Sequence, residues 1–172
     1  MAEIFKSGLV RRDECLIAFM IVGSAELCDK ISKGLHQSAK KRKWHICIHQ
    51  CESIVDVIKA KLEISVDFII FAFNLRILNT LSEIEANIAI IDENYITSGA
   101  VCLVNCNGIS NVTGLIYKSK NLCHKYNIHF LSTNISNTQA CIYLGSRILN
   151  ITEGVLGLTS GIPVIGTVVK HN

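Results

Sequence analysis

Apolar and polar positions alternate in blocks along this chain. Runs in which every position is apolar are typical of strands buried on both faces of a parallel sheet. Between them lie segments whose apolar residues recur with helical spacing, as in a helix with one buried face. The segments expected to form strands cover residues 15–22, 44–49, 66–74, 100–105 and 128–132, and those at 15–22, 66–74 and 100–105 contain such a run. The segments expected to form helices cover residues 25–38, 54–62, 81–94, 112–126 and 141–151.

This alternation predicts an α/β fold, a three-layer sandwich with a mostly parallel, Rossmann-like sheet. A length of 172 residues fits one domain, so a single domain is expected over residues 1–172. From about residue 152 to residue 172 the chain stays apolar but is interrupted by glycines and by Pro163. So many glycines argue against a continuing helix. This C-terminal segment is expected to pack over the domain or to form an interface.

Charge and cysteine content narrow the possible partners. The net charge of +3 is too small to require nucleic acid, and the basic run at residues 40–43 is interpreted as a solvated loop. Direct contact with nucleic acid is therefore not expected. Most of the eight cysteines lie inside apolar segments, which favours free thiols and a reducing compartment. No apolar run reaches the length of a membrane span, so no membrane association is expected.

The first strand enters its helix where a phosphate-binding loop would lie. The turn begins at Gly23, and such a loop needs a second Gly followed by Lys and then Ser or Thr. Those three positions hold Cys28, Asp29 and Lys30. Asp29 places a carboxylate where the cation belongs, and Cys28 blocks the close approach that Gly allows. The loop is therefore predicted to be degenerate, with no cofactor bound there.

A second nucleotide motif is also degraded. A guanine-nucleotide fold would end the strand at residues 100–105 in Asn-Lys-x-Asp, whereas this chain has Asn105, Cys106 and Gly108 at the Asn, Lys and Asp positions. Phosphoryl transfer depends almost wholly on positioned charges and a metal ion. No catalytic residues are therefore predicted.

The strand at residues 44–49 offers a metallic alternative. His45, Cys47, His49 and Cys51 share one face if the strand continues, and zinc prefers these ligand types. The four side chains of one straight strand cannot close a tetrahedron, because the end pair would lie about 20 Å apart. Two of them could join two ligands from elsewhere, but no second pair is evident in the sequence. The expectation is a sheet face of mixed polarity with no metal site.

The order of several motifs resembles the centromere protein M family. The strand and following Asn-Leu at residues 66–75, Ile91-Asp92, the strand at residues 99–103 and the segment at residues 155–159 carry this resemblance. It extends over residues 64–160 and is thin before them. In the last of these segments Leu156 stands where the family has Pro.

The resemblance implies a small-GTPase-like fold without functional nucleotide motifs, acting as a structural subunit of the inner kinetochore. It implies centromere protein I as a partner, with centromere proteins H and K and other inner kinetochore subunits. It also implies a nuclear location at the centromere and kinetochore, no enzymatic activity and no cofactor. The expected interface residues are Ile90, Leu156, Leu158, Ile162 and Val164, with packing inside the domain as the other interpretation.

Two alternatives stay open. One is a divergent, nucleotide-binding GTPase-like protein that uses Lys30 in a rebuilt site. The other is a GTPase-like adaptor from another pathway, such as trafficking. Nucleotide binding distinguishes the first, since a bound ligand would stabilise the fold.

Overall fold

The computed structural model describes residues 5–6, 16–74, 77, 80–107 and 113–158. Five parallel strands form one sheet in the order β3-β2-β5-β6-β7, which confirms the predicted α/β class. Their bounds are Leu16–Val22 (β2), His45–Cys51 (β3), Phe68–Phe73 (β5), Val101–Asn105 (β6) and His129–Ser132 (β7). A second, small sheet pairs β1 (Phe5–Lys6) with β4 (Ile64–Ser65).

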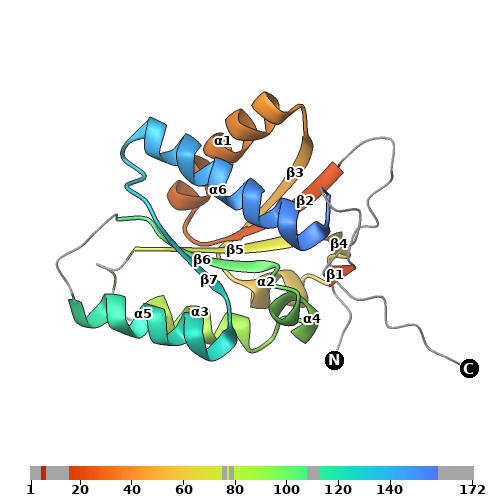
Figure 1. The fold of residues 1–172 in the computed structure, drawn as a ribbon. Coiled ribbons are helices and arrows are strands. Elements are labelled where there is room, and N and C mark those ends of the chain that lie inside the picture. The colour runs from red at the N-terminus through yellow and green to blue at the C-terminus, as the bar shows by residue number, and fades with distance from the viewer. Residues whose placement is uncertain (1–4, 7–15, 75–76, 78–79, 108–112, 159–172) are drawn as a thin grey trace, which may run out of the picture.

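Helices cover both faces of the five-stranded sheet. Figure 1 shows α1 and α6 on one face, with α3 and α5 on the other. The helix bounds are Ala25–Arg42 (α1), Ile54–Lys59 (α2), Thr80–Ile88 (α3), Glu93–Thr97 (α4), Thr113–Tyr126 (α5) and Thr138–Leu156 (α6). The inner strands β5 and β6 are buried along their whole length, as their continuous apolar sequences predict.

The single helix expected at residues 81–94 is wrong. The structure ends α3 at Ile88 and starts α4 at Glu93, and Asp92 lies between them as the N-cap of α4. The Asp92 carboxylate accepts a hydrogen bond from the Asn94 N–H at 2.8 Å. A carboxylate is unfavourable late in a helix but stabilises a helix start, and this explains the break.

The C-terminal segment also differs from the prediction at its start. Helix α6 continues through Gly154 to Leu156 and ends at Gly157, which adopts a left-handed conformation with φ of 65°. Residues 152–156 are therefore helical. Gly154 lies on the exposed side of this helix, with open space where a Cβ would be. The rest of the segment, from residue 159, lies outside the described residues.

Helices α1 and α6 approach each other closely at two glycines. A Cβ on Gly34 would lie 2.3 Å from the Cys141 carbonyl oxygen, and one on Gly145 would lie 2.5 Å from the Gly34 carbonyl oxygen. This close contact lets the Ser38 hydroxyl donate to the Ile142 carbonyl oxygen at 2.8 Å. At the far end Arg42 forms a 3.1 Å ion pair with Glu153. The packing of α1 against α6 therefore requires glycine at positions 34 and 145.

A buried carboxylate joins β2 to the start of β5. Asp67, which is 2% exposed, accepts a hydrogen bond from the Ala18 N–H at 2.9 Å. The Asp67 N–H in turn donates to the Ala18 carbonyl oxygen at 2.7 Å. The Asp67 side chain thus adds one hydrogen bond to the backbone pairing of β2 with β5.

Candidate functional site

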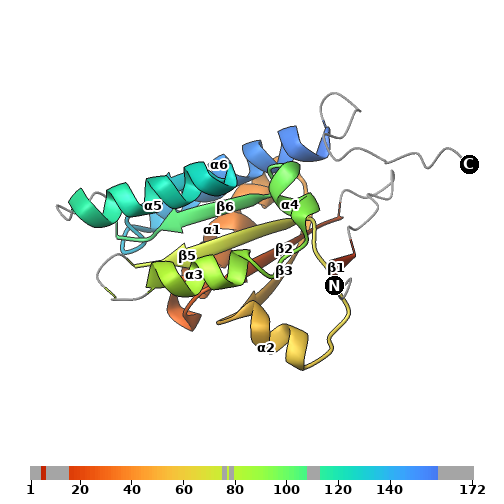
Figure 2. The same ribbon diagram turned by 90° about the horizontal axis from the view of Figure 1, so that it is seen from below.

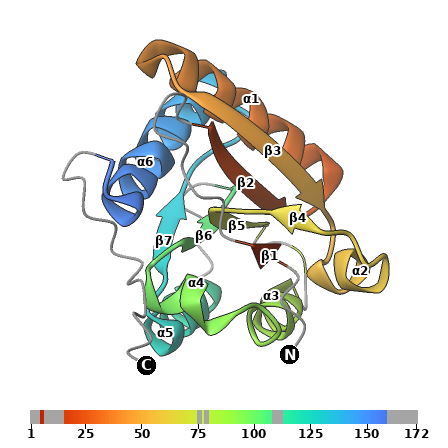
Figure 3. The same cartoon turned by 90° about the vertical axis from the view of Figure 1, so that its right-hand side faces the viewer.

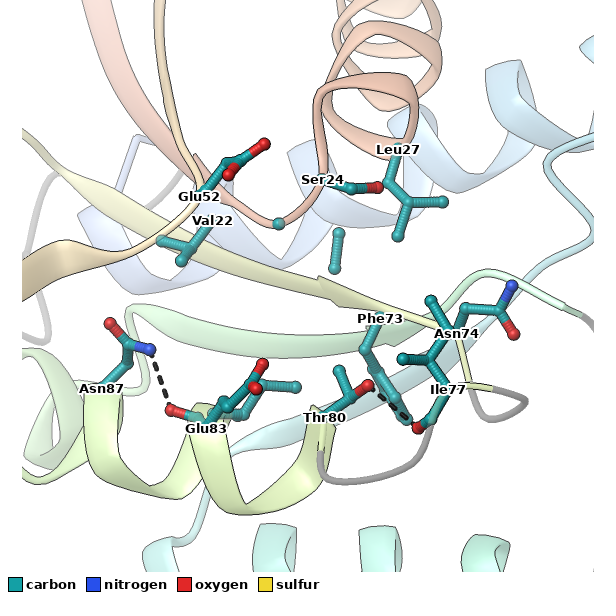
Figure 4. A pocket seen from close by; sticks show the side chains of 13 residues that line it. Val22, Ser24, Leu27, Glu52, Phe73, Asn74, Ile77, Thr80, Glu83 and Asn87 are labelled. Atoms are coloured by element: carbon teal, nitrogen blue, oxygen red, sulfur yellow. Dashed lines mark hydrogen bonds between the residues drawn. The ribbon is translucent and has the colours of Figure 1, made fainter. Parts of the chain in front are cut away.

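The sheet order places a topological switch point between β2 and β5. The chain leaves β2 for β3 on one side, and its later strands add on the other side of β2. In open α/β sheets of this kind, ligands bind in the crevice outside the carboxyl ends of the strands at this point. The chain has a cavity of about 250 Å³ there, between the ends of β2 and β5 and the start of α3 (Figure 4). It is the candidate site.

Several elements contribute its walls. The lining residues are Val22, Gly23, Ser24, Leu27, Glu52, Ala72, Phe73, Asn74, Ile77, Thr80, Glu83, Ile84 and Asn87. Leu27, Ala72 and Ile84 make an apolar floor, whereas Ser24, Glu52 and Glu83 are exposed at the rim. Among the described lining residues there are two carboxylates and no Lys, Arg or His. The cavity therefore presents a polar, negatively charged rim.

Asn87 fixes the wall of the cavity that α3 provides. Its side-chain oxygen accepts from the Ile54 N–H at 2.8 Å and from the Ser53 hydroxyl at 3.2 Å. Its amide nitrogen donates to the Glu83 carbonyl oxygen at 2.8 Å. Asn87 thereby ties α3 to the start of α2 and holds Glu52, just before α2, close to the cavity.

Gly23 is required for packing in this turn. A Cβ at this position would lie 2.6 Å from the Ala72 carbonyl oxygen, so β5 leaves no room for a side chain. The Gly23 N–H donates to the Cys51 carbonyl oxygen at 2.9 Å and continues the ladder between β2 and β3. Only Gly23 and Ser24 separate β2 from α1. The turn is thus too short to wrap around a phosphate. The Gly23 N–H, which such a loop would offer to the phosphate, already donates to a backbone carbonyl oxygen.

The other residues of the predicted degenerate loop lie away from the cavity. Cys28 is buried, and its thiol donates to the Gly23 carbonyl oxygen at 3.3 Å. Asp29 and Lys33 form an ion pair at 2.7 Å on the exposed side of α1. Lys30 pairs with Glu26 at 2.6 Å, and this hydrogen bond raises the pKa of Lys30. A rebuilt site using Lys30 gains no support from this position.

The second degenerate motif is part of an amide network at the ends of the strands. The Asn105 amide nitrogen donates to the Ser132 hydroxyl at 3.2 Å, and its side-chain oxygen accepts from the Asn107 N–H at 3.2 Å. Asn107 also donates to the Asn74 side-chain oxygen, and Asn74 lines the cavity. Gly108 lies outside the described residues. The network links the ends of β6 and β7 to the site. The sequence did not predict this link, because Asn74, Asn105 and Ser132 lie in separate segments of the chain.

Buried thiols surround this end of the sheet. Burial raises the pKa of Cys28 to about 11 and that of Cys106 to about 12. Every cysteine that the structure describes is a free thiol. At neutral pH these groups are protonated packing residues.

These pKa values predict a loss of stability at high pH. A folded-state pKa above the ordinary value of 9.0 gives stability that is complete below pH 9 and disappears as the pH rises through 11. We expect each of these thiols to lower the free energy of unfolding by about 2 kcal/mol between pH 8 and pH 11. Urea unfolding at pH 8, 9, 10 and 11 measures it. Cys106→Ser should reduce the slope, and an unchanged slope would contradict the assignment to buried thiols.

The residues expected at a partner interface differ in their exposure to solvent. Leu156 is 9% exposed and packs into the core, so for this residue packing inside the domain is the better interpretation. Leu158 is partly buried against the same core. Ile90 is 43% exposed in the break between α3 and α4. Ile162 and Val164 lie outside the described residues.

Metal and membrane sites were also considered. In the described part of the chain, three or more His, Cys, Asp or Glu side chains never gather in a way that could hold a metal ion. None of the helices described combines the length and apolar character that crossing a membrane requires.

Comparison with known proteins supports the fold. No family model matches the sequence, and no curated protein matches it. The structure is similar to an oxidoreductase from Corynebacterium diphtheriae, with a TM-score of 0.53 at 10% identity, over 81% of this chain and 97% of that one.

Two weaker likenesses are to other redox proteins. One is to rubredoxin oxygen:oxidoreductase from Desulfovibrio gigas, with a TM-score of 0.45 at 10% identity over 80% of this chain and 35% of that one. The other is to a flavodoxin from Streptococcus pneumoniae TIGR4, with a TM-score of 0.44 at 6% identity over 78% of this chain and 98% of that one. At such identities a likeness concerns the fold alone, and these two scores are too low to carry an argument.

The kinetochore identification is therefore corrected. The resemblance to the centromere protein M family is wrong, since no family model matches and the structural likeness is to an oxidoreductase. The structural-subunit function and the partners, centromere proteins I, H and K, rested on that resemblance and are wrong with it. So is the nuclear, centromeric location, which was inferred from the same resemblance.

The predicted absence of enzymatic activity is corrected as well. It was inferred from lost GTPase motifs, whereas the solved structure that this fold resembles with a TM-score of 0.53 is described as an oxidoreductase. The sheet order β3-β2-β5-β6-β7 is the order of flavodoxin-like sheets once the two short strands are left out. The chain thus has a doubly wound α/β fold of the flavodoxin-like, Rossmann-like kind.

Proposed function

We propose that the chain binds a phosphate-free ligand with sugar or ribityl hydroxyls, a nucleoside or riboflavin, at the switch-point cavity. The observation that carries this proposal is the position of Glu52, which directly follows β3 and lines the cavity beside the β2–α1 turn. In doubly wound folds an acidic residue beyond the glycine turn accepts hydrogen bonds from ribose hydroxyls. The Ser24 hydroxyl does not cap α1 and supplies a second polar contact at the rim.

The fold family implies flavin mononucleotide, but its phosphate does not fit the described residues. The glycine N–H that would bind it is already bonded to the Cys51 carbonyl oxygen. Glu52 and Glu83 would also face the phosphate charge. At roughly 8 Å and an effective dielectric constant of about 40, each such charge pair costs on the order of 1 kcal/mol. The arrangement therefore favours a ligand without the phosphate.

The size of the cavity agrees with a small ligand. Its volume of about 250 Å³ lies below the ~300–1,000 Å³ that is usual for sites of drug-sized molecules. A sugar or ribityl group fits inside, and the attached ring would extend over the apolar residues Leu27 and Ile77. Ile77 is 60% exposed and would be covered by such a ring.

A finer statement of the fold belongs with this proposal. Within the doubly wound class, we infer a small-GTPase-like variant whose nucleotide motifs do not function. Cys28 and Asp29 at the loop positions support the loss of the nucleotide motifs, because Cys28 packs inward and Asp29 pairs with Lys33. This variant should bind guanosine without gaining affinity from its phosphates.

Binding measurements with matched ligands test the proposal. We expect riboflavin or guanosine to bind at least about tenfold more tightly than flavin mononucleotide, GMP or magnesium GTP. Riboflavin fluorescence and isothermal titration calorimetry report the affinities. Equal or tighter binding of the phosphorylated forms, or no binding of any of them, would overturn the proposal.

A matched pair of variants isolates the carboxylate. Glu52→Gln should weaken riboflavin or guanosine binding by about tenfold, because a hydrogen bond to a charged group contributes about 1.5–3 kcal/mol. Glu52→Gln should also reduce the ratio between the affinity for riboflavin or guanosine and the affinity for their phosphorylated forms. Glu63→Gln removes an exposed carboxylate outside the cavity lining and should change neither affinity.

A further inference from the structure

Strand β3 carries a thiol and an imidazole that lie outside the switch-point cavity. Cys47 Sγ and His49 Nε2 are 3.6 Å apart on one face of the strand. Zinc binds Cys sulfur at about 2.3 Å and His nitrogen at about 2.1 Å, so at a tetrahedral angle these two atoms would lie about 3.6 Å apart. The pair thus already has the spacing of two ligands that share one zinc ion. In the described part of this chain no third ligand joins it.

The two missing ligands can come from the free edge of the same strand. Among the described residues β3 pairs only with β2, so it forms the border of the sheet, as Figures 2 and 3 show. The Cys51 carbonyl oxygen accepts from the Gly23 N–H and therefore points toward β2. Backbone groups alternate along a strand, so those of Cys47 and His49 also point toward β2. The backbone groups of Ile48 and its alternate neighbours point outward.

This alternation allows one symmetric pairing of two β3 strands. An antiparallel pair centred on Ile48 hydrogen-bonds Ile46 of each copy with Gln50 of the other. Cys47 then lies opposite His49 of the second copy in a non-hydrogen-bonded pair, where Cα atoms are about 4.5 Å apart and side chains are closest. All four side chains lie on the same face of the joined sheet. Two half-sites thus meet at the two-fold axis.

The charges at the ends of β3 favour the same arrangement. A basic run at residues 40–43 precedes the strand, whereas Glu52 and Asp56 follow it. Antiparallel pairing places the basic end of one copy beside the acidic end of the other. A parallel or shifted pairing would separate these charges or place like charges together, which is unfavourable.

We propose that two copies of this chain join along β3 and bind one zinc ion through Cys47 and His49 of each copy. Each Cys47 thiol gives up its proton to solvent and binds as a thiolate, and each His49 binds through Nε2 as a neutral imidazole. Two thiolates balance the charge of Zn²⁺, and no electron is transferred. The site is a closed Cys₂His₂ tetrahedron of structural type.

Sedimentation velocity of the reduced, metal-free full chain, titrated with zinc chloride, tests the proposal. We expect conversion to a dimer that is complete at one zinc per two chains, with the metal counted by mass spectrometry. Cobalt in place of zinc should give the visible bands of a tetrahedral thiolate site. A monomer that binds zinc, or a dimer that forms equally well with a chelator present, would overturn the proposal.

Variants on the same strand separate this site from adventitious binding to other thiols. Cys47→Ser and His49→Gln should each lower zinc affinity by more than about 100-fold, beyond what loss of an outer-shell contact costs. Cys51→Ser is the matched control, because Cys51 shares the face but lies against Met20 Sδ at 3.7 Å. It should keep one zinc per dimer. Loss of zinc in Cys51→Ser, or retention in Cys47→Ser, would contradict the assignment.

A further variant tests the edge and leaves the ligands unchanged. Gln50→Pro removes an N–H that points away from β2, a position where an edge strand tolerates proline. It should leave the melting temperature of the metal-free monomer nearly unchanged and abolish the zinc-dependent dimer. A normal dimer in Gln50→Pro would show that β3 is not the contact.

Discussion

Replacing Gly34 with Ala is expected to lower the free energy of unfolding by about 3 kcal/mol or more. The new Cβ would lie 2.3 Å from the Cys141 carbonyl oxygen, and the obstacle is backbone, which cannot rotate away. Helix α6 would have to move off α1. This movement would break the hydrogen bond from Ser38 to Ile142 and expose Leu35 and Leu144, which are buried at the contact.

Urea unfolding monitored by circular dichroism measures this effect, and the neighbouring helix provides a control. Gly154→Ala places the same methyl group on α6 at a point with nothing within 4 Å. It should stabilise the fold by about 0.5–1 kcal/mol, because glycine is a poor helix residue. If Gly34→Ala behaved like Gly154→Ala, the close crossing of the two helices would be wrong.

Replacing Asp67 with Ala is expected to cost about 2–3 kcal/mol. The substitution leaves the buried Ala18 N–H without the carboxylate oxygen that accepts it at 2.9 Å. A buried donor without a partner carries its full desolvation penalty. The loss falls on the pairing of β2 with β5, the two strands that flank the switch point.

Hydrogen exchange combined with chemical unfolding measures this second effect. The Ala18 amide should exchange faster in Asp67→Ala than in the wild-type chain. Asp67→Asn keeps an oxygen acceptor and should lose less, and Asp56→Ala, on an exposed position of α2, should lose almost nothing. Similar stability losses in all three variants would argue against a specific role for the buried carboxylate.

The strands could be predicted well because most are buried on both faces. Residues 68–73 and 100–104 are continuously apolar, and β5 and all of β6 except its last residue lie within these ranges. The mixed polarity of residues 44–49 agrees with the position of β3 at the edge of the sheet. The break before α4 was missed, because Ile88 and Ile91 continue a helical spacing across it. Capping by Asp92 outweighed that spacing.

The candidate site was only partly predictable. The turn at Gly23 was found because a strand, a glycine and a helix follow one another in the sequence. Glu52 follows β3, whereas Thr80 and Asn87 come from α3, and the hydrogen bond between Asn87 and the Ile54 N–H that ties these segments together appears only in the folded chain. The family assignment failed because it was inferred from short apolar segments, which many α/β sheets share.

The crossing of α1 and α6 has a consequence for how the chain is made. Ser38 and its partner Ile142 are 104 residues apart, so α1 is synthesised long before the helix that covers it. At about 5–20 residues per second, roughly 5–20 s pass between the two. Throughout that time the apolar face of α1 at Gly34, which also carries Ile31 and Leu35, is exposed to solvent or bound by a chaperone. A nascent chain stalled before residue 138 should therefore bind chaperones strongly, and release should coincide with emergence of the last helix from the ribosome.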